Sequence, residues 1–112
     1  MRQRRPRVKS EGRLNRTRAL PCVICGGYPS DPAHLRAPSL DYGKRYLGKS
    51  EKPDDRWVNT LCRPHHDDQH QHGDECDWWA LQGIDPFATS TALYEVTGDY
   101  DAALRVISEA RP

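Results

Sequence analysis

Long hydrophobic segments are missing from this sequence. No run of about 18 apolar residues is present that could span a bilayer, and the N-terminus lacks the apolar stretch that a secretory signal requires. These absences predict a cytoplasmic protein with no membrane partner. Because disulfide bonds are disfavoured in the cytoplasm, we expect the four cysteines to have another use.

Apolar residues that could build a core are also scarce. The 112 residues include one Phe and one Met, and the mean hydropathy is -0.92. A chain of this length forms one domain with a modest core, or a smaller domain with a tail, so burial alone stabilises the fold weakly. A bound metal ion would supply the missing stability.

Charge is divided unevenly along the chain. The first 18 residues contain eight Lys or Arg and one acid, Glu11, and therefore carry +7, which leaves −6 for the remainder because the total is +1. We expect residues 1–18 to form a basic flexible arm, disordered to about residue 16 because hydrophobic periodicity is absent. Such an arm favours binding to nucleic acid phosphates. The alternative is a solvated tail without a partner.

The rest of the chain predicts a mixture of extended and helical segments, so the expected fold class is α+β. Turn residues and proline positions place the helix starts, and β-branched and aromatic residues indicate the strand. The expected elements are an extended stretch at 31–36, a long loop at 37–56, a strand at 57–61, a short helix from Pro64 to about Gly73, a helix over 78–83 or 86–96, and a helix over 100–110 with Asp99 or Asp101 near its N-cap.

Cysteine and histidine residues are concentrated in two clusters. The first is Cys22-x-x-Cys25, and the second begins with Cys62-x-x-His65-His66. Two ligand pairs separated by a loop are typical of a tetrahedral zinc site, so we expect the three cysteines and one of the two histidines, assigned as His65, to bind a structural Zn²⁺ ion. A thioredoxin-like redox pair would need a βαβ setting that the chain does not show. Unpaired buried cysteines are the remaining alternative.

Two histidines are left over from this zinc site. His66 and His70 are four residues apart, which on a helix puts both imidazoles on one face in adjacent turns. They can therefore share a second metal ion. The alternative is a solvated polar helix.

The order of these motifs resembles the HNH nucleases of the ββα-metal class. The resemblance covers about residues 20–72, and the segments 20–26, 33–36, 52–57 and 61–66 are similar to small HNH-like proteins of phages and prophages. It implies a zinc-stapled ββα unit over residues 19–73. We expect residues 74–112 to form a helical extension that packs Trp78, Trp79, Phe87 and Leu93 against this unit.

The resemblance also implies roles for individual residues. His34 matches the general base, with its second nitrogen oriented by a backbone carbonyl. His66 and His70 match the ligands of a catalytic divalent ion, which could be Mg²⁺, Mn²⁺, Ni²⁺ or Zn²⁺. Asn59 is assigned to the middle position of the motif, with Asp55 as the alternative. Ala33 departs from the family, where Asp or His at this place ligates the metal.

The function implied is a metal-dependent endonuclease that hydrolyses phosphodiester bonds in DNA, with His34, Asn59 and His66 as catalytic residues. The alternative is a catalytically inactive, zinc-stabilised nucleic-acid-binding module. A third reading is a protein-interaction module that uses the acidic C-terminal region. The sequence names neither a protein partner nor the form of the nucleic acid.

Overall fold

The computed structural model describes residues 11–45, 47–48 and 54–111. These residues form an α+β fold, as predicted from the sequence. None of the helices within these ranges is long and apolar enough to cross a membrane. The elements are α1 (Glu11–Arg18), β1 (Ser30–His34), β2 (Val58–Cys62), α2 (Arg63–His72), α3 (Glu75–Gln82), α4 (Pro86–Glu95) and α5 (Tyr100–Ala110).

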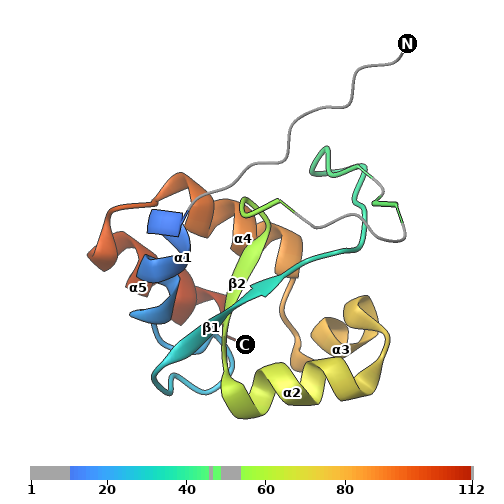
Figure 1. Ribbon diagram of the computed structural model, residues 1–112, viewed down its shortest axis with the longest axis horizontal. Helices are drawn as coiled ribbons and strands as arrows, with labels where there is room; N and C mark the ends of the chain where they lie inside the picture. Colours follow the sequence, from blue (N-terminus) through green and yellow to red (C-terminus); the bar gives the residue numbers. More distant parts are fainter. Residues whose placement is uncertain (1–10, 46, 49–53, 112) are drawn as a thin grey trace.

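The two strands form an antiparallel sheet in the middle of the molecule (Figure 1). Ser30 lies opposite Cys62, and His34 lies opposite Val58. Past the end of β1, the Leu35 N–H donates to the Trp57 carbonyl at 2.9 Å. The long loop between the strands therefore leaves and re-enters the sheet at a fixed point, close to His34.

Helix α2 follows β2 without a connecting residue. The helix begins at Arg63, with Pro64 in its first turn where a missing N–H costs nothing, and it ends before Gly73 at φ 89°. The predicted short helix is thus confirmed. An antiparallel hairpin followed at once by a helix places His66 of α2 beside Asp31 of β1.

Helix α1 corrects the prediction that the chain is disordered to about residue 16. Arg13 is buried, and its guanidinium donates to the Asp55 carbonyl at 2.8 Å. Thr17 is buried on the same face, one turn later. The predicted basic flexible arm is therefore helical from Glu11, whereas residues 1–10 lie outside the described ranges.

The C-terminal region contains three helices where two were predicted. Asp74, Asp85 and Asp99 each accept backbone N–H bonds at the start of a helix, and these caps define α3, α4 and α5. Gly83, at φ 72°, ends α3 in the left-handed conformation that suits glycine. Both alternatives for the first predicted helix, 78–83 and 86–96, therefore form.

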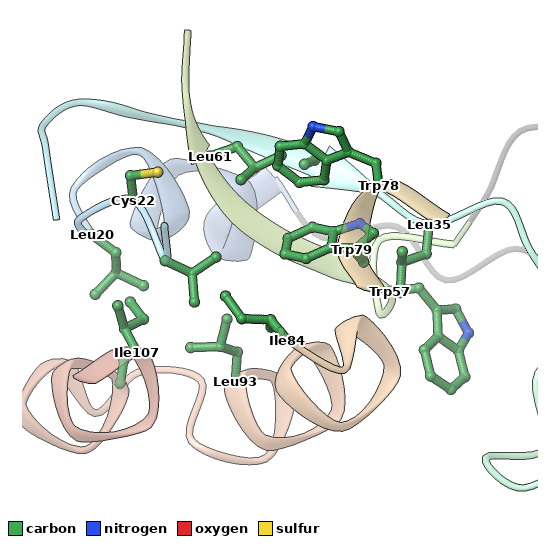
Figure 2. Close-up of a cluster of buried hydrophobic side chains, with 13 residues drawn as sticks. Leu20, Cys22, Leu35, Trp57, Leu61, Trp78, Trp79, Ile84, Leu93 and Ile107 are labelled. Carbon is green, nitrogen blue, oxygen red and sulfur yellow. The ribbon is translucent and has the colours of Figure 1, made fainter. Parts of the chain in front are cut away.

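The core joins this extension to the sheet. Figure 2 shows Trp78 beside Leu61 and Trp79 beneath Trp78, with Ile84 and Leu93 lower still. Both tryptophans are at most 2% exposed, and Phe87 packs against the cluster from outside. The predicted packing of Trp78, Trp79, Phe87 and Leu93 is confirmed, and the two tryptophans are core residues.

Candidate functional site

Three cysteines and one histidine converge at the end of the sheet where β2 meets α2. The ligand atoms of Cys22, Cys25, Cys62 and His65 all lie within 4.8 Å of one another. The Cys25 and Cys62 sulfurs are 3.8 Å apart, and the His65 Nδ1 atom lies 3.2 Å from the Cys62 sulfur and 3.7 Å from the Cys22 sulfur. The predicted four residues are therefore brought together.

These separations suit a tetrahedral metal ion. Zinc–sulfur bonds of about 2.3 Å and zinc–nitrogen bonds of about 2.0–2.1 Å imply ligand separations of about 3.5–3.8 Å. Neither disulfide geometry nor a redox pair accounts for four ligands from two distant segments, and all of these cysteines are free thiols. The cluster can hold a structural metal ion such as zinc.

Two backbone N–H groups favour the thiolate form of the cysteines in the first ligand loop, residues 22–27. The Ile24 N–H points to the Cys22 sulfur and the Gly27 N–H to the Cys25 sulfur, each at 3.4 Å. The Gly27 N–H lowers the pKa of Cys25, because it favours the thiolate. Burial instead raises the pKa of Cys62 to about 11. A metal ion is the charge that would compensate the Cys62 thiolate.

On α2, His66 and His70 lie side by side, as the four-residue spacing predicts. Their ring centroids are 4.5 Å apart, with the rings nearly perpendicular. The Nδ1 atom of His66 lies 3.2 Å from a carboxylate oxygen of Asp31, which also pairs with Arg63. Such a carboxylate orients an imidazole and leaves its other nitrogen available as a ligand. Asp31 was missed by the sequence analysis, because its contact crosses from β1 to α2.

At the opposite end of β1, His34 is held by Asp55. The His34 Nε2 atom is 2.8 Å from the Asp55 carboxylate, which is buried. The sequence analysis expected a backbone carbonyl to orient this ring, whereas the partner of Nε2 in the structure is a carboxylate. A carboxylate can only accept a hydrogen bond, so Nε2 carries the proton and Nδ1 has the free lone pair of the neutral ring.

The structure places Asn59 differently from the sequence assignment. Asn59 is fully buried in β2, and its amide donates to the Pro86 carbonyl at 3.1 Å. A fully buried side chain does not meet a substrate. Of the two residues considered for the middle position, Asp55 is the one next to His34, so the preference for Asn59 is not supported.

A cavity of about 830 Å³ connects the two histidine regions. His34 lines one side of it and His70 another, although one is on β1 and the other on α2. The remaining wall comes largely from the loop after β1. The residues that line this cavity, named the His34–His70 cavity, are His34, Arg36, Ala37, Pro38, Leu47, Gly48, Gln69, His70, Gly73 and Glu75.

Glu75 fastens the loop to α3 at the edge of this cavity. Its carboxylate accepts the backbone N–H groups of Arg36 and Ala37 at 2.9–3.2 Å. The buried Lys44 amine donates to the Arg36 carbonyl at 3.1 Å. Burial lowers the pKa of Lys44, and the Glu75 charge opposes that shift. The first part of the loop is thereby positioned on the helices.

Comparison with known proteins adds no family to this description. No protein-family model, curated protein or solved structure matches the chain. Among the described residues, the Cys22, Cys25, Cys62 and His65 group is the only one in which three or more potential ligand atoms lie within 4.8 Å of each other. The assignment of His34, His66 and His70 to catalysis therefore stays a prediction.

Proposed function

We propose that the protein is a metal-dependent endonuclease that hydrolyses phosphodiester bonds in DNA. The observation that carries the proposal is the shared cavity of His34 and His70, with Asp55 behind His34. The fold supports it as well, because an antiparallel hairpin followed by a histidine-bearing helix is the arrangement that the HNH resemblance implies.

His34 acts as the general base in this proposal. Asp55 accepts the Nε2 proton and holds the ring, so the Nδ1 lone pair can take a proton from the water that attacks the phosphate. The imidazolium that forms is stabilised by the Asp55 carboxylate. In this proposal Asp55, the alternative to Asn59 for the middle position of the motif, is the residue that positions His34.

His66 and His70 would hold the divalent ion, which when bound polarises the phosphate and offsets charge on the leaving oxygen. Asp31 orients His66 for this purpose, in the manner of the carboxylates behind many metal-binding histidines. Ala33 offers no ligand, so water and substrate oxygens would have to supply the remaining ligands. The Cys22, Cys25, Cys62 and His65 site, with Zn²⁺, would fix the hairpin against the start of α2.

The test is a cleavage assay on the purified, zinc-loaded protein. Supercoiled plasmid and single-stranded circular DNA are incubated with Mg²⁺, Mn²⁺, Ni²⁺ or Zn²⁺, and with EDTA as the blank. We expect divalent-dependent nicking that is lost in His34→Ala. Cleavage retained by His34→Ala would assign the activity to a contaminant or to another site.

The second candidate is an inactive, zinc-stabilised nucleic-acid-binding module. One observation favours it. In the described part of the chain, none of His34, His66 and His70 belongs to a group of three or more potential metal ligands. Absence of cleavage with every ion, together with retained DNA binding, would establish this candidate in place of the nuclease.

A further inference from the structure

A second, smaller cavity lies on the same loop as the His34–His70 cavity. Its volume is about 250 Å³, which is below the roughly 300–1,000 Å³ of sites for drug-sized ligands and suits one planar ring system. Leu47 lines both cavities, so the two are neighbours. The walls of this stacking cavity are Tyr42, Gly43, Lys44, Arg45, Leu47, Asp54, Arg56 and Trp57.

Its aromatic wall is held rigidly from behind. The Tyr42 ring stacks on Phe87 of α4, with centroids 6.2 Å apart and planes 20° apart. Phe87 in turn meets Trp57 edge to face at 6.4 Å. Figure 2 shows Trp57 at the margin of the core, away from Trp78 and Trp79. Tyr42 remains 37% exposed, so part of a ring fixed by the core is available to a ligand.

The charge of the stacking cavity is positive. Among the described residues that line it, Lys44, Arg45 and Arg56 are basic and Asp54 is acidic. The Arg56 guanidinium lies over the Trp57 ring, with its central carbon 3.9 Å from the ring centroid. An exposed aromatic ring flanked by fixed cations is the pattern with which proteins bind a base and its phosphate in single-stranded nucleic acid.

Lys44 links the stacking cavity to the His34–His70 cavity. Its amine lies 5.9 Å from the Trp57 ring centroid and donates to the carbonyl of Arg36, a residue that lines the His34–His70 cavity. A strand that reaches His34 can therefore continue into the neighbouring stacking cavity. A base in a duplex has both faces covered by its neighbours, and it must leave the stack to lie on Tyr42.

We propose that the stacking cavity binds one unpaired nucleotide of the DNA strand, adjacent to the bond that is cut. The base lies on Tyr42, and its phosphate is contacted by Arg45. The position next to the cut bond rests on the proposed function, whereas the preference for an unpaired nucleotide does not. The preferred substrate is thus single-stranded DNA or a duplex with an unpaired segment.

The experiment measures binding without cleavage. The zinc-loaded protein, with no second metal added, is titrated into a labelled single-stranded oligonucleotide and into the blunt duplex of the same length, and anisotropy gives the two dissociation constants. The wild type should bind the single strand more tightly. Tyr42→Ala should weaken single-strand binding roughly tenfold and change duplex binding by less than about twofold.

Two variants serve as controls. Tyr42→Phe keeps the stacking face and should retain the wild-type preference, and Leu40→Ala removes a fully exposed apolar side chain of the same loop without touching the cavity. Equal wild-type affinity for both forms, or equal effects of Tyr42→Ala on both, would overturn the proposal. Should Tyr42→Ala lose its zinc or its fold, Arg45→Gln takes its place with the same expected loss of single-strand preference.

Cleavage is scored separately, so that the two proposals can fail independently. In one outcome, the wild type shows no cleavage with any divalent ion and still binds single strands preferentially through Tyr42. That result rejects the proposed nuclease function and retains the proposal for the stacking cavity. Cleavage of fully paired DNA as fast as of single-stranded DNA, unaffected by Tyr42→Ala, rejects the stacking cavity and keeps the nuclease.

Discussion

Arg111 donates to the backbone carbonyl of Cys22 at 3.2 Å, across 89 residues of chain. A second bond joins its Nε atom to the Val23 carbonyl at 3.4 Å. The same guanidinium lies where a side chain at position 26 would be, 2.5 Å from an ideal Cβ on Gly26, which has φ 76°. The residue that follows α5 therefore clamps the first ligand loop, and that loop requires glycine.

Arg111→Ala should loosen the zinc ligands without removing any of them. Loss of two partly exposed hydrogen bonds is expected to lower the free energy of unfolding by about 1 kcal/mol and to speed zinc transfer to a chelator several-fold. A colorimetric chelator assay and thermal denaturation measure these effects. Arg105→Ala, which removes an exposed arginine of α5, is the matched control. Identical zinc release from the two variants would show that the clamp has no role.

Cys22→Ser or Cys62→Ser should release the metal and unfold the domain, because metal-binding energy in such sites is folding energy. Metal content should fall from one zinc per chain to none, and the cooperative thermal transition should disappear. Cys76→Ser is the control, since Cys76 is exposed and outside the cluster. A cooperative transition that persists in the zinc-free wild type would contradict the structural role of the metal.

His34→Ala and His66→Ala should abolish cleavage for different reasons while both keep the zinc. The first removes the base and is expected to cost on the order of 10² to 10⁴ in rate at any metal concentration. The second weakens the divalent ion itself, so a high metal concentration should partly restore the rate. His72→Ala, whose ring contacts Asp77 on α3, should cleave normally. Loss of zinc from His66→Ala but not from His65→Ala would show that His66, and not His65, is the zinc ligand.

Asp55→Asn and Asn59→Ala should separate activity from stability. Asp55→Asn lets His34 adopt the other tautomer, and kcat should fall on the order of 10²-fold with KM little changed. Asn59→Ala removes the buried bond to the Pro86 carbonyl and should cost about 1–3 kcal/mol of stability. Cleavage kinetics and urea denaturation report the two effects. A fully stable Asn59→Ala protein with no activity would instead support the original assignment of Asn59 as a catalytic residue.

Deletion of residues 1–10 should weaken DNA binding and leave the fold intact. These residues contain five Lys or Arg and no acid, so their loss should make the dependence of affinity on salt shallower. Deletion of residues 1–16 should in addition destabilise the protein, because it removes the buried Arg13 and its bond to Asp55. Titrations at several salt concentrations test the first point. An unchanged salt slope would exclude a role in phosphate binding.

The metal cluster and α2 could be predicted because their signals are local. Cys-x-x-Cys, Cys-x-x-His and a proline in the first turn each specify geometry within a few residues. Helix α5 was predicted for the same reason, as Ala103 and Ile107 repeat at helical spacing and are buried.

Helix α1 and the contact of Asp55 with His34 could not be found in this way. The buried face of α1 carries Arg13 and Thr17, so no hydrophobic periodicity marks it, and its position depends on a carbonyl 42 residues away. Asp55 reaches His34 across 21 residues of loop. The sequence gives no sign of such a contact unless the ends of the loop are already known to meet.

The bond between Leu35 and Trp57 has a consequence for the evolution of this fold. Both residues are buried, and the bond between them joins the two ends of the intervening loop. Because the entropy of closing a loop grows only with the logarithm of its length, insertions and deletions within this loop disturb the hairpin and the metal cluster little. In the proposed nuclease, the segment that carries Tyr42 and Arg45 can thus be exchanged as a module, and new substrate preferences can arise on an unchanged scaffold.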